Sequence, residues 1–384
     1  MTLTVGIIGI HGFSRLHLTQ FLARQAAGGC RVIAAVAHQR ELDEAYAANL
    51  EAQGVRLVPD LEALLTLKPQ LVSVPLGIHL HTPVTLRCLQ AGCHVYLEKP
   101  IAGSVAEVDQ LIAAEHTSGK TVLVGFQDLY QPGLWELQRR LVAKEFGAVR
   151  QITVSVGWPR PRDYYARNKW AGRLKLGEAW VRDSIANNAC AHYLNAALFL
   201  AGDRAGQTAR PAQLVAELGR GYAIESFDTG SISVTTATGI QVLFNASHLG
   251  QTEYAPRVRI DTAAGAITID NLEQGNSWLL PDGSTIPVLA RHEVPYQHAL
   301  RFLAGEDVPV CRLHHGRAHT VVIESAHAAG TIADLPGLVS DAGHIRQPRM
   351  DAALALAHER GTTLSSTGLV PGLVPSAPCN ILDA

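Results

Sequence analysis

The chain has 384 residues, enough for two domains with cores of their own. Hydrophobic residues make up 47% and charged residues 17%, which excludes a disordered chain, and the formal net charge of -2 argues against binding to nucleic acid or to an anionic membrane. The six scattered cysteines, with no Cys-x-x-Cys pair, fit reduced thiols. Because no apolar run reaches about 18 residues and no basic, cleavable leader precedes the first strand, we expect a cytoplasmic protein without a membrane span.

The first predicted elements are a buried strand over residues 3–8, a glycine turn and a helix. Such a turn can hold a phosphate group, because the N–H groups and the dipole of the helix start face it. The dinucleotide fingerprint G-x-G-x-x-G would place glycines at 9, 11 and 14. This chain keeps only the first of them, so we expect a weakened cofactor cradle made of Gly9, His11, Gly12, Phe13 and Ser14.

The second predicted strand covers residues 31–37 and runs into His38-Gln39-Arg40. An acidic residue at this strand end would bind the adenosine ribose hydroxyls of NAD, and the strand end carries none. Arg40 could instead bind the 2′-phosphate of NADP, although a solvated loop arginine is the alternative. We expect NAD or NADP as the cofactor, with NADP favoured by Arg40 and with His38 and Arg40 as contacts.

Four further strands, at residues 55–58, 70–76, 95–97 and 121–124, alternate with predicted helices near 61–67, 84–89 and 105–114. This alternation predicts a doubly wound parallel sheet. The strand at 95–97 ends at Glu98-Lys99-Pro100, because proline cannot donate to a sheet ladder. Ligands bind outside the carboxyl ends of parallel strands, so Lys99 is a candidate for chemistry, with a surface lysine as the alternative.

The second half of the chain contains strand patterns without helices between them, at residues 151–157, 213–218, 230–234, 240–244, 258–261 and 266–269. Such a run predicts an antiparallel or mixed sheet that is separate from the first. Residues from 336 onward are rich in glycine and proline around one predicted helix near 351–360, and we expect either an extended arm or a frayed tail. His314, His315 and His319 have no carboxylate or cysteine at ligand spacing, so no metal site is expected.

A loop after the strand at 151–157 is dense in aromatic and arginine side chains. Aromatic rings offer flat faces to sugar C–H groups, and arginines bind carboxylate or phosphate groups through forked hydrogen bonds. We expect substrate contacts here, and the alternative is that the aromatics pack under the loop while the arginines are solvated. The candidate residues are Trp158, Arg160, Arg162, Tyr165, Arg167 and Trp170.

A predicted helix near residue 200 begins with a second candidate stretch, in which Asn188, His192 and Asn195 are spaced to share one helix face. Histidine can take a hydroxyl proton near neutral pH, which suits His192 to a catalytic role. Asparagine can hydrogen-bond a substrate but cannot act as a base. Asp183 could supply the negative charge that Asn188 lacks only if the chain turns its side chain inward. A satisfied core or surface histidine is the alternative for His192.

Several of these pieces together resemble the glucose–fructose oxidoreductase/inositol dehydrogenase family, Gfo/Idh/MocA. The resemblance rests on His81, on the A-G-x-H-V-x-x-E-K-P motif at residues 91–100, on Gly125-Phe126-Gln127 and on residues 146–149. It covers roughly residues 1–335. The chain departs from the family in its glycine turn, in the segment before His81, and at Asn188 and Asn195, where the family has acids.

The resemblance implies an N-terminal Rossmann-type doubly wound parallel sheet plus a C-terminal α+β domain with a large, mostly antiparallel open-faced sheet. The expected ranges are 1–124 for the dinucleotide-binding domain, 125–335 for the substrate-binding and oligomerisation domain, and 336–384 for the arm. It implies a Lys99–Pro100 bond that is often cis and catalytic roles for Lys99 and His192, helped by Asn188. It adds His81, Glu98, Lys99, Pro100 and Gln127 to the cofactor contacts and Lys99, Asn188 and His192 to the substrate contacts.

The expected function is that of an NAD(P)-dependent oxidoreductase, which transfers a hydride between the nicotinamide and a secondary hydroxyl of a sugar, cyclitol or sugar acid. Two alternatives stay open: a redox-neutral, NAD-dependent glycoside hydrolase of the same family, and a non-catalytic nucleotide- or sugar-sensing protein. The expected partners are a small sugar or polyol, neutral or anionic, and further copies of the chain in a homodimer or homotetramer.

Overall fold

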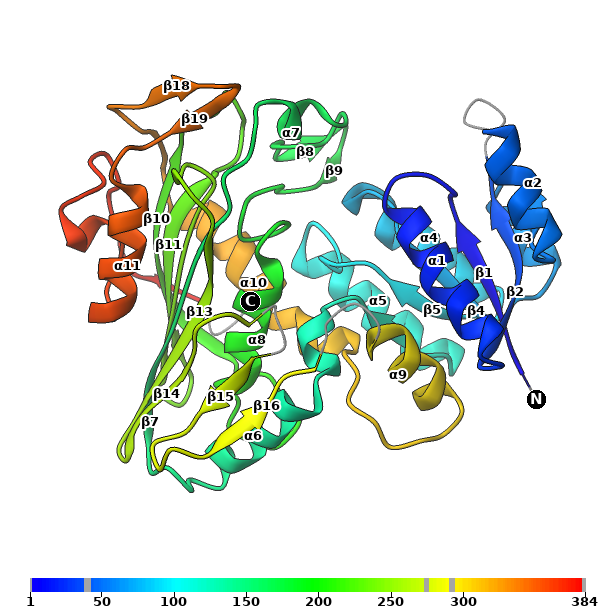
Figure 1. Cartoon of the computed structure of the whole chain (residues 1–384), viewed down its shortest axis with the longest axis horizontal. Helices are drawn as coiled ribbons and strands as arrows, with labels where there is room; N and C mark the ends of the chain where they lie inside the picture. The colour runs from blue at the N-terminus through cyan, green and yellow to red at the C-terminus, as the bar shows by residue number, and fades with distance from the viewer. Residues whose placement is uncertain (1, 38–42, 273–275, 290–293, 382–384) are drawn as a thin grey trace. The chain divides into compact units, whose positions relative to one another are not determined.

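The computed structural model describes residues 2–37, 43–272, 276–289 and 294–381 (Figure 1). The chain packs into two compact units. The first comprises residues 1–102, 106–130 and 292–313, and the second comprises residues 103–105, 131–291 and 314–384. The predicted ranges 1–124, 125–335 and 336–384 stay a prediction about domains, since the units follow packing rather than chain order.

The first unit contains a six-stranded sheet in the order β3-β2-β1-β4-β5-β6, and every neighbouring pair in it is parallel. Its strands are β1 (Leu3–Ile8), β2 (Cys30–Val36), β3 (Arg56–Val58), β4 (Leu71–Val74), β5 (His94–Leu97) and β6 (Val122–Val124). Its helices are α1 (Phe13–Ala26), α2 (Glu44–Ala52), α3 (Leu61–Thr66), α4 (Ile78–Gln90), α5 (Val105–Ser118), η2 (Gln127–Tyr130) and α9 (Val294–Leu303). The predicted doubly wound parallel sheet is confirmed.

Local sequence explains where several of these helices start. Asp60 caps α3, because its carboxylate accepts a hydrogen bond from the Ala63 N–H over 2.8 Å. Asp43 caps α2 in the same way, and this helix was not among the predicted elements. Helix α4 begins at Ile78, several residues earlier than expected, so His81 lies on a helix rather than in a loop.

The second unit is built on a ten-stranded mixed sheet, whose path is β16-β15-β14-β13-β7-β12-β11-β10-β17 with β20 beside β10. Its pairs are antiparallel except for β7 with β12 and β10 with β17, so the predicted mostly antiparallel sheet is confirmed. The strands are β7 (Val149–Gly157), β10 (Pro211–Arg220), β11 (Thr229–Thr236), β12 (Gln241–Ser247), β13 (Tyr254–Thr262), β14 (Gly265–Ile269), β15 (Ser277–Leu279), β16 (Thr285–Pro287), β17 (Ile332–Asp334) and β20 (Cys379–Asn380). Two separate hairpins are β8 (Lys175–Leu176) with β9 (Ala179–Trp180), and β18 (Val339–Asp341) with β19 (His344–Arg346).

Helices of the second unit pack on both faces of this sheet. They are α6 (Pro132–Val142), α7 (Asp163–Ala166), α8 (Ala191–Leu200), α10 (Leu313–Ala329), α11 (Met350–Arg360) and η3 (Ser365–Thr367). Helices α8 and α11 lie on opposite sides of β7 (Figure 1). Alternate residues of a strand point to opposite faces, so β7 can contact a helix on each side. On the α11 side, Gly157 approaches Leu354 so closely that a Cβ added to Gly157 would lie 2.7 Å from the Leu354 Cδ1 atom.

The C-terminal segment packs on the sheet of its own unit. Leu354, Leu364 and Val370 belong to a buried apolar cluster. Polar groups of the sheet also bind the segment: the Ser365 N–H and hydroxyl both donate to the Glu217 carboxylate, over 3.1 and 2.6 Å. The prediction of a frayed tail is therefore wrong for the described part of this segment, because burial of its apolar residues fixes it.

Candidate active site

The turn between β1 and α1 has the backbone of a phosphate cradle. Gly9 adopts φ +95°, and the space in front of its Cα is taken by Ser14, whose hydroxyl donates to the Ile8 carbonyl over 3.1 Å. Gly12 precedes α1 with φ 55° and ψ -129°, a conformation open to glycine alone. The Gly12 Cα has open space before it, since a Cβ would meet no atom within 4 Å.

Glycine therefore stands one position later than in the standard fingerprint, next to the helix start. The side chain of Phe13 is 53% exposed, and the buried Nε2 atom of His11 has no hydrogen-bond partner among the described residues. The order of the sheet reverses between β1 and β4, and ligands of open parallel sheets bind at such a switch point. The open space at Gly12 and the unpaired His11 nitrogen fit a dinucleotide in this cradle. The predicted contacts His38 and Arg40 lie outside the described residues.

Glu98 is held by a buried chain of side chains at the carboxyl end of β5. One carboxylate oxygen lies 3.1 Å from Nε2 of His17, and Nδ1 of His17 lies 2.7 Å from the Ser73 hydroxyl. Because a carboxylate only accepts, the Nε2–H of His17 donates to Glu98. The second Glu98 oxygen accepts from the Lys99 backbone N–H over 3.1 Å, which ties the lysine's backbone to this chain.

Burial by itself would raise the pKa of Glu98. The hydrogen bond and charge of His17, together with the nearby Lys99 cation, outweigh burial and lower the pKa of the Glu98 carboxyl. Glu98 is thus ionised within a nearly closed environment. The sequence reasoning did not identify His17 as a site residue. The signal that could have found it is a histidine that falls on the buried face of α1 with Leu18 and Phe21.

His81 contacts the backbone around the Lys99–Pro100 bond, which is cis as the resemblance implied. Its Nδ1 atom lies 2.8 Å from the Pro100 carbonyl oxygen, and its Nε2 atom lies 3.0 Å from that of Leu76. Burial lowers the pKa of His81, and the carbonyl acceptors oppose that shift. These contacts position the turn after β5. Gln127, at the start of η2 just after β6, is half-buried.

The expectation that Asn188, His192 and Asn195 share a helix face is wrong for Asn188. Helix α8 begins only at Ala191, and Asn188 lies in the turn before it. The backbone departs from α-helical geometry before α8, since the Cys190 N–H donates to the Ile185 carbonyl over 2.8 Å, and the Asn188 amide donates to the Asp183 carboxylate over 2.8 Å. His192 is partly exposed in the first turn of α8, whereas Asn195 is fully buried.

Asp183 turns inward, the condition under which it could supply the charge missing at Asn188. Its side chain is 2% exposed, and it accepts from the Gly172 N–H over 2.6 Å. The Arg167 guanidinium lies 3.7 Å from the same carboxylate oxygen. Asp183 therefore joins the loop arginine to the turn that carries Asn188.

The aromatic and arginine residues of the loop divide into two groups. The Arg160 guanidinium lies over the Trp158 and Tyr164 rings, and that of Arg167 lies over the Tyr164 and Trp170 rings. The Arg162 guanidinium instead donates to the Ser340 hydroxyl over 3.1 Å, beside the β18–β19 hairpin. The structure thus brings Arg160 and Arg167 together around one ring and separates Arg162 from them.

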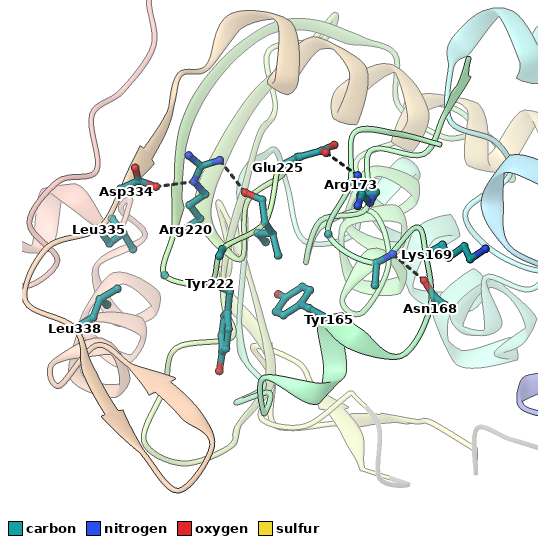
Figure 2. A pocket seen from close by; sticks show the side chains of 15 residues that line it. Tyr165, Asn168, Lys169, Arg173, Arg220, Tyr222, Glu225, Asp334, Leu335 and Leu338 are labelled. Carbon is teal, nitrogen blue, oxygen red and sulfur yellow. Dashed lines mark hydrogen bonds and ion pairs between the residues drawn. The ribbon is translucent and has the colours of Figure 1, made fainter. Parts of the chain in front are cut away.

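A pocket of about 740 Å³ within the second unit is lined in part by Tyr165 (Figure 2). Tyr165 and Tyr222 face each other in it, with ring centroids 5.0 Å apart. Its arginines pair with its acids: Arg220 with Asp334 over 2.6 Å, and Arg173 with Glu225 over 3.1 Å. Both arginines of this wall are therefore neutralised by acids, and Lys169 is a further cation among the lining residues.

Among the described residues, no group of three or more His, Cys, Asp or Glu side chains is arranged to hold a metal ion. None of the described helices is both long enough and apolar enough to cross a membrane.

A parallel sheet of this order with a glycine cradle at its switch point defines a Rossmann-type dinucleotide-binding protein. The family model for the oxidoreductase family with an NAD-binding Rossmann fold matches residues 3–126, and the GFO/IDH/MocA C-terminal domain matches residues 134–268. The chain belongs to the Gfo/Idh/MocA oxidoreductase family, as the resemblance predicted.

Curated relatives are distant. A putative UDP-kanosamine synthase oxidoreductase subunit of Amycolatopsis mediterranei is 31% identical over 184 residues, 48% of this chain and 49% of the relative. This chain thus spans about half the length of that relative. An inositol 2-dehydrogenase of Rhizobium meliloti is 22% identical over 71% of this chain and 76% of its own length.

Solved structures share the fold. The WlbA dehydrogenase from Bordetella pertussis, in complex with NADH and UDP-GlcNAcA, superposes with a TM-score of 0.70 and 20% identity, covering 85% of this chain and 96% of that one. The UDP-N-acetylglucosamine 3-dehydrogenase GnnA from Acidithiobacillus ferrooxidans gives a TM-score of 0.65 and 20% identity over 85% and 97%.

Proposed function

We propose that the protein is a dehydrogenase that uses NAD(H) to interconvert a secondary hydroxyl and a ketone on a sugar or cyclitol. The observation that carries the proposal is the placement of Lys99 at the carboxyl end of β5, fixed through Glu98, His17 and Ser73. This end of the sheet also bears the β1–α1 cradle. The dehydrogenases and oxidoreductases among the relatives support the reaction class.

The first unit would bind the cofactor. Backbone N–H groups at Gly12 and Phe13 would hold the pyrophosphate, and Glu98, Lys99 and Pro100 would line the nicotinamide end. Bound NAD supplies the acceptor for a hydride from the substrate carbon. Lys99 would donate a hydrogen bond to the oxygen on that carbon. The nearby Lys99 cation is among the groups that lower the pKa of Glu98, so this carboxylate would stay ionised beside the lysine.

The second unit would move the proton. His192 would take the hydroxyl proton as the C–H bond breaks, and would return it in the reverse direction. Asn188 would hydrogen-bond the substrate, with its amide oriented by Asp183. Because an amide carries no charge, the proton would pass through His192 alone on this unit.

The direct test follows reduced-nicotinamide absorbance while the purified chain is incubated with NAD, or in a second series NADP, and a panel of sugars and cyclitols. We expect net reduction with at least one secondary alcohol, and its loss in Lys99→Met and in His192→Ala. Release of aglycone from an aryl glycoside without net reduction would refute the proposal in favour of a redox-neutral hydrolase. The NADP preference, the cytoplasmic location and the homodimer or homotetramer stay predictions.

A further inference from the structure

Two arginines and a histidine of the second unit surround the ring of Tyr164. The guanidinium of Arg167 lies 3.7 Å from the ring centroid and that of Arg160 lies 5.1 Å from it, while the His248 ring is 5.5 Å away. Arg167 faces Asp183, but Arg160 has no carboxylate within ion-pair distance among the described residues. The cluster therefore carries excess positive charge.

The hydrogen bonding of His248 leaves one of its nitrogens as an unused donor. His248 is 2% exposed, and its Nδ1 atom lies 2.6 Å from the Tyr165 hydroxyl. Burial raises the pKa of Tyr165 well above its usual value, so the phenol keeps its proton and donates it to Nδ1. Burial and the two arginines lower the pKa of His248, so the ring is neutral and its proton lies on Nε2.

This Nε2–H has no acceptor among the described residues, and neither has the buried Nε–H of Arg160. The two donors belong to neighbouring segments, because the Arg160 backbone N–H donates to the His248 carbonyl over 3.3 Å. The indole N–H of Trp158, whose ring lies beneath Arg160, is likewise buried without a partner in this part of the chain. Buried donors are normally paired, so several orphans beside excess positive charge indicate that an acceptor from outside completes the site.

We propose that His248, Arg160 and Arg167 form a subsite for an anionic substituent of the substrate, a carboxylate or a phosphate group. The inference rests on the proposed function, because it assigns this group to the molecule that His192 would act on. Asp183 connects the two places: it faces Arg167 on one side and accepts from Asn188 on the other. The pocket that Tyr165 helps to line is a weaker candidate for an anion, since both of its arginines already pair with acids (Figure 2).

The test is calorimetric binding of three probes to the full chain saturated with NADH: D-glucuronate, D-glucose 1-phosphate and D-glucose. We expect at least one anionic probe to bind about tenfold or more tightly than glucose, as charge-assisted hydrogen bonds would give. Tighter binding of glucuronate identifies a sugar acid, and tighter binding of glucose 1-phosphate identifies a sugar phosphate or sugar nucleotide. Arg160→Gln should abolish the preference, whereas Arg162→Gln, two residues along the same loop but bonded to Ser340, should keep it.

Equal binding of all three probes by the wild type would overturn the subsite, as would an unchanged preference in Arg160→Gln. If Arg160→Gln does not fold, Arg167→Gln answers the same question at the other cation. The two proposals can be refuted separately. Nicotinamide reduction with neutral cyclitols and no anion preference would support the dehydrogenase and refute the subsite. Anion preference without nicotinamide reduction would support the anion-binding cluster and refute the dehydrogenase.

Discussion

The Asn188 amide donates to the Asp183 carboxylate over 2.8 Å, and this bond places a buried negative charge next to the position where the family carries an acid. An amide that donates through its nitrogen to Asp183 is fixed in orientation, because its two ends cannot exchange without losing the bond. The negative charge of Asp183 is thus one hydrogen bond away from Asn188, the residue that stands where the family has an acid.

Replacement of Asp183 by Asn should lower kcat about 10- to 100-fold with a smaller change in KM, because it removes the negative charge and leaves one acceptor oxygen for two donors, the Gly172 N–H and the Asn188 amide. The measurement is steady-state kinetics with the best substrate from the panel. Asp163→Asn, an exposed residue in α7, serves as control and should leave both constants unchanged. An unchanged kcat in Asp183→Asn would show that Asp183 only supports the loop.

The His17→Phe variant should lose about 3 kcal/mol of unfolding free energy in urea titrations, because it removes the charge-assisted hydrogen bond from His17 to the buried Glu98 carboxylate. Adding Glu98→Gln should restore part of that loss, since a neutral amide needs no counter-charge. A double variant as unstable as the sum of the two single variants would mean that the residues are not coupled.

Gly12→Ala should weaken NADH binding about tenfold in a fluorescence titration, because φ 55° with ψ -129° strains any residue that has a Cβ. The matched control is Gly28→Ala, which also has a positive φ, +78°, and no atom within 4 Å of its Cβ position. Both variants should lose stability, but Gly28→Ala should bind NADH normally. Equal losses of affinity would contradict a cradle at Gly12.

Stability should depend on pH through Asp228, whose pKa burial raises from 3.8 to about 6. Because the folded state holds this proton more tightly than the unfolded state, the contribution is present below pH 4 and is lost as the pH rises to 6. Relative to Asp228→Asn, the wild type should lose about 3 kcal/mol of unfolding free energy between pH 4 and pH 7. Urea titrations of both proteins across this range measure it, and parallel curves would refute the raised pKa.

The Leu354→Ala variant should cost about 3 kcal/mol, since Leu354 of α11 is fully buried against Gly157 of the sheet. The same type of truncation at Val374, which is 68% exposed, should cost almost nothing. Thermal or urea unfolding compares the two. A negligible loss for Leu354→Ala would mean that α11 detaches from the sheet before the rest unfolds.

Local patterns predicted much of this protein. The alternation of apolar strands with helices predicts a parallel sheet, because strand and helix patterns repeat with periods of two and 3.6 residues. Pro100 ends the strand before it and so places Lys99 at the carboxyl end of that strand, because proline cannot donate to a sheet ladder. The period-two strands of the second half are all present in the mixed sheet. The motif at residues 91–100, together with His81 and residues 125–127 and 146–149, carried the resemblance, and the family models confirm the family.

Tertiary structure decided which side chains meet. His17 reaches Glu98 across 81 residues of sequence, and Tyr165 reaches His248 across 83. The same sequence left Arg160, Arg162 and Arg167 equivalent, and only packing placed two of them around Tyr164 and the third beside Ser340. Local propensity acts over a few residues, whereas these long-range contacts depend on which strands become neighbours and on the register in which they pair.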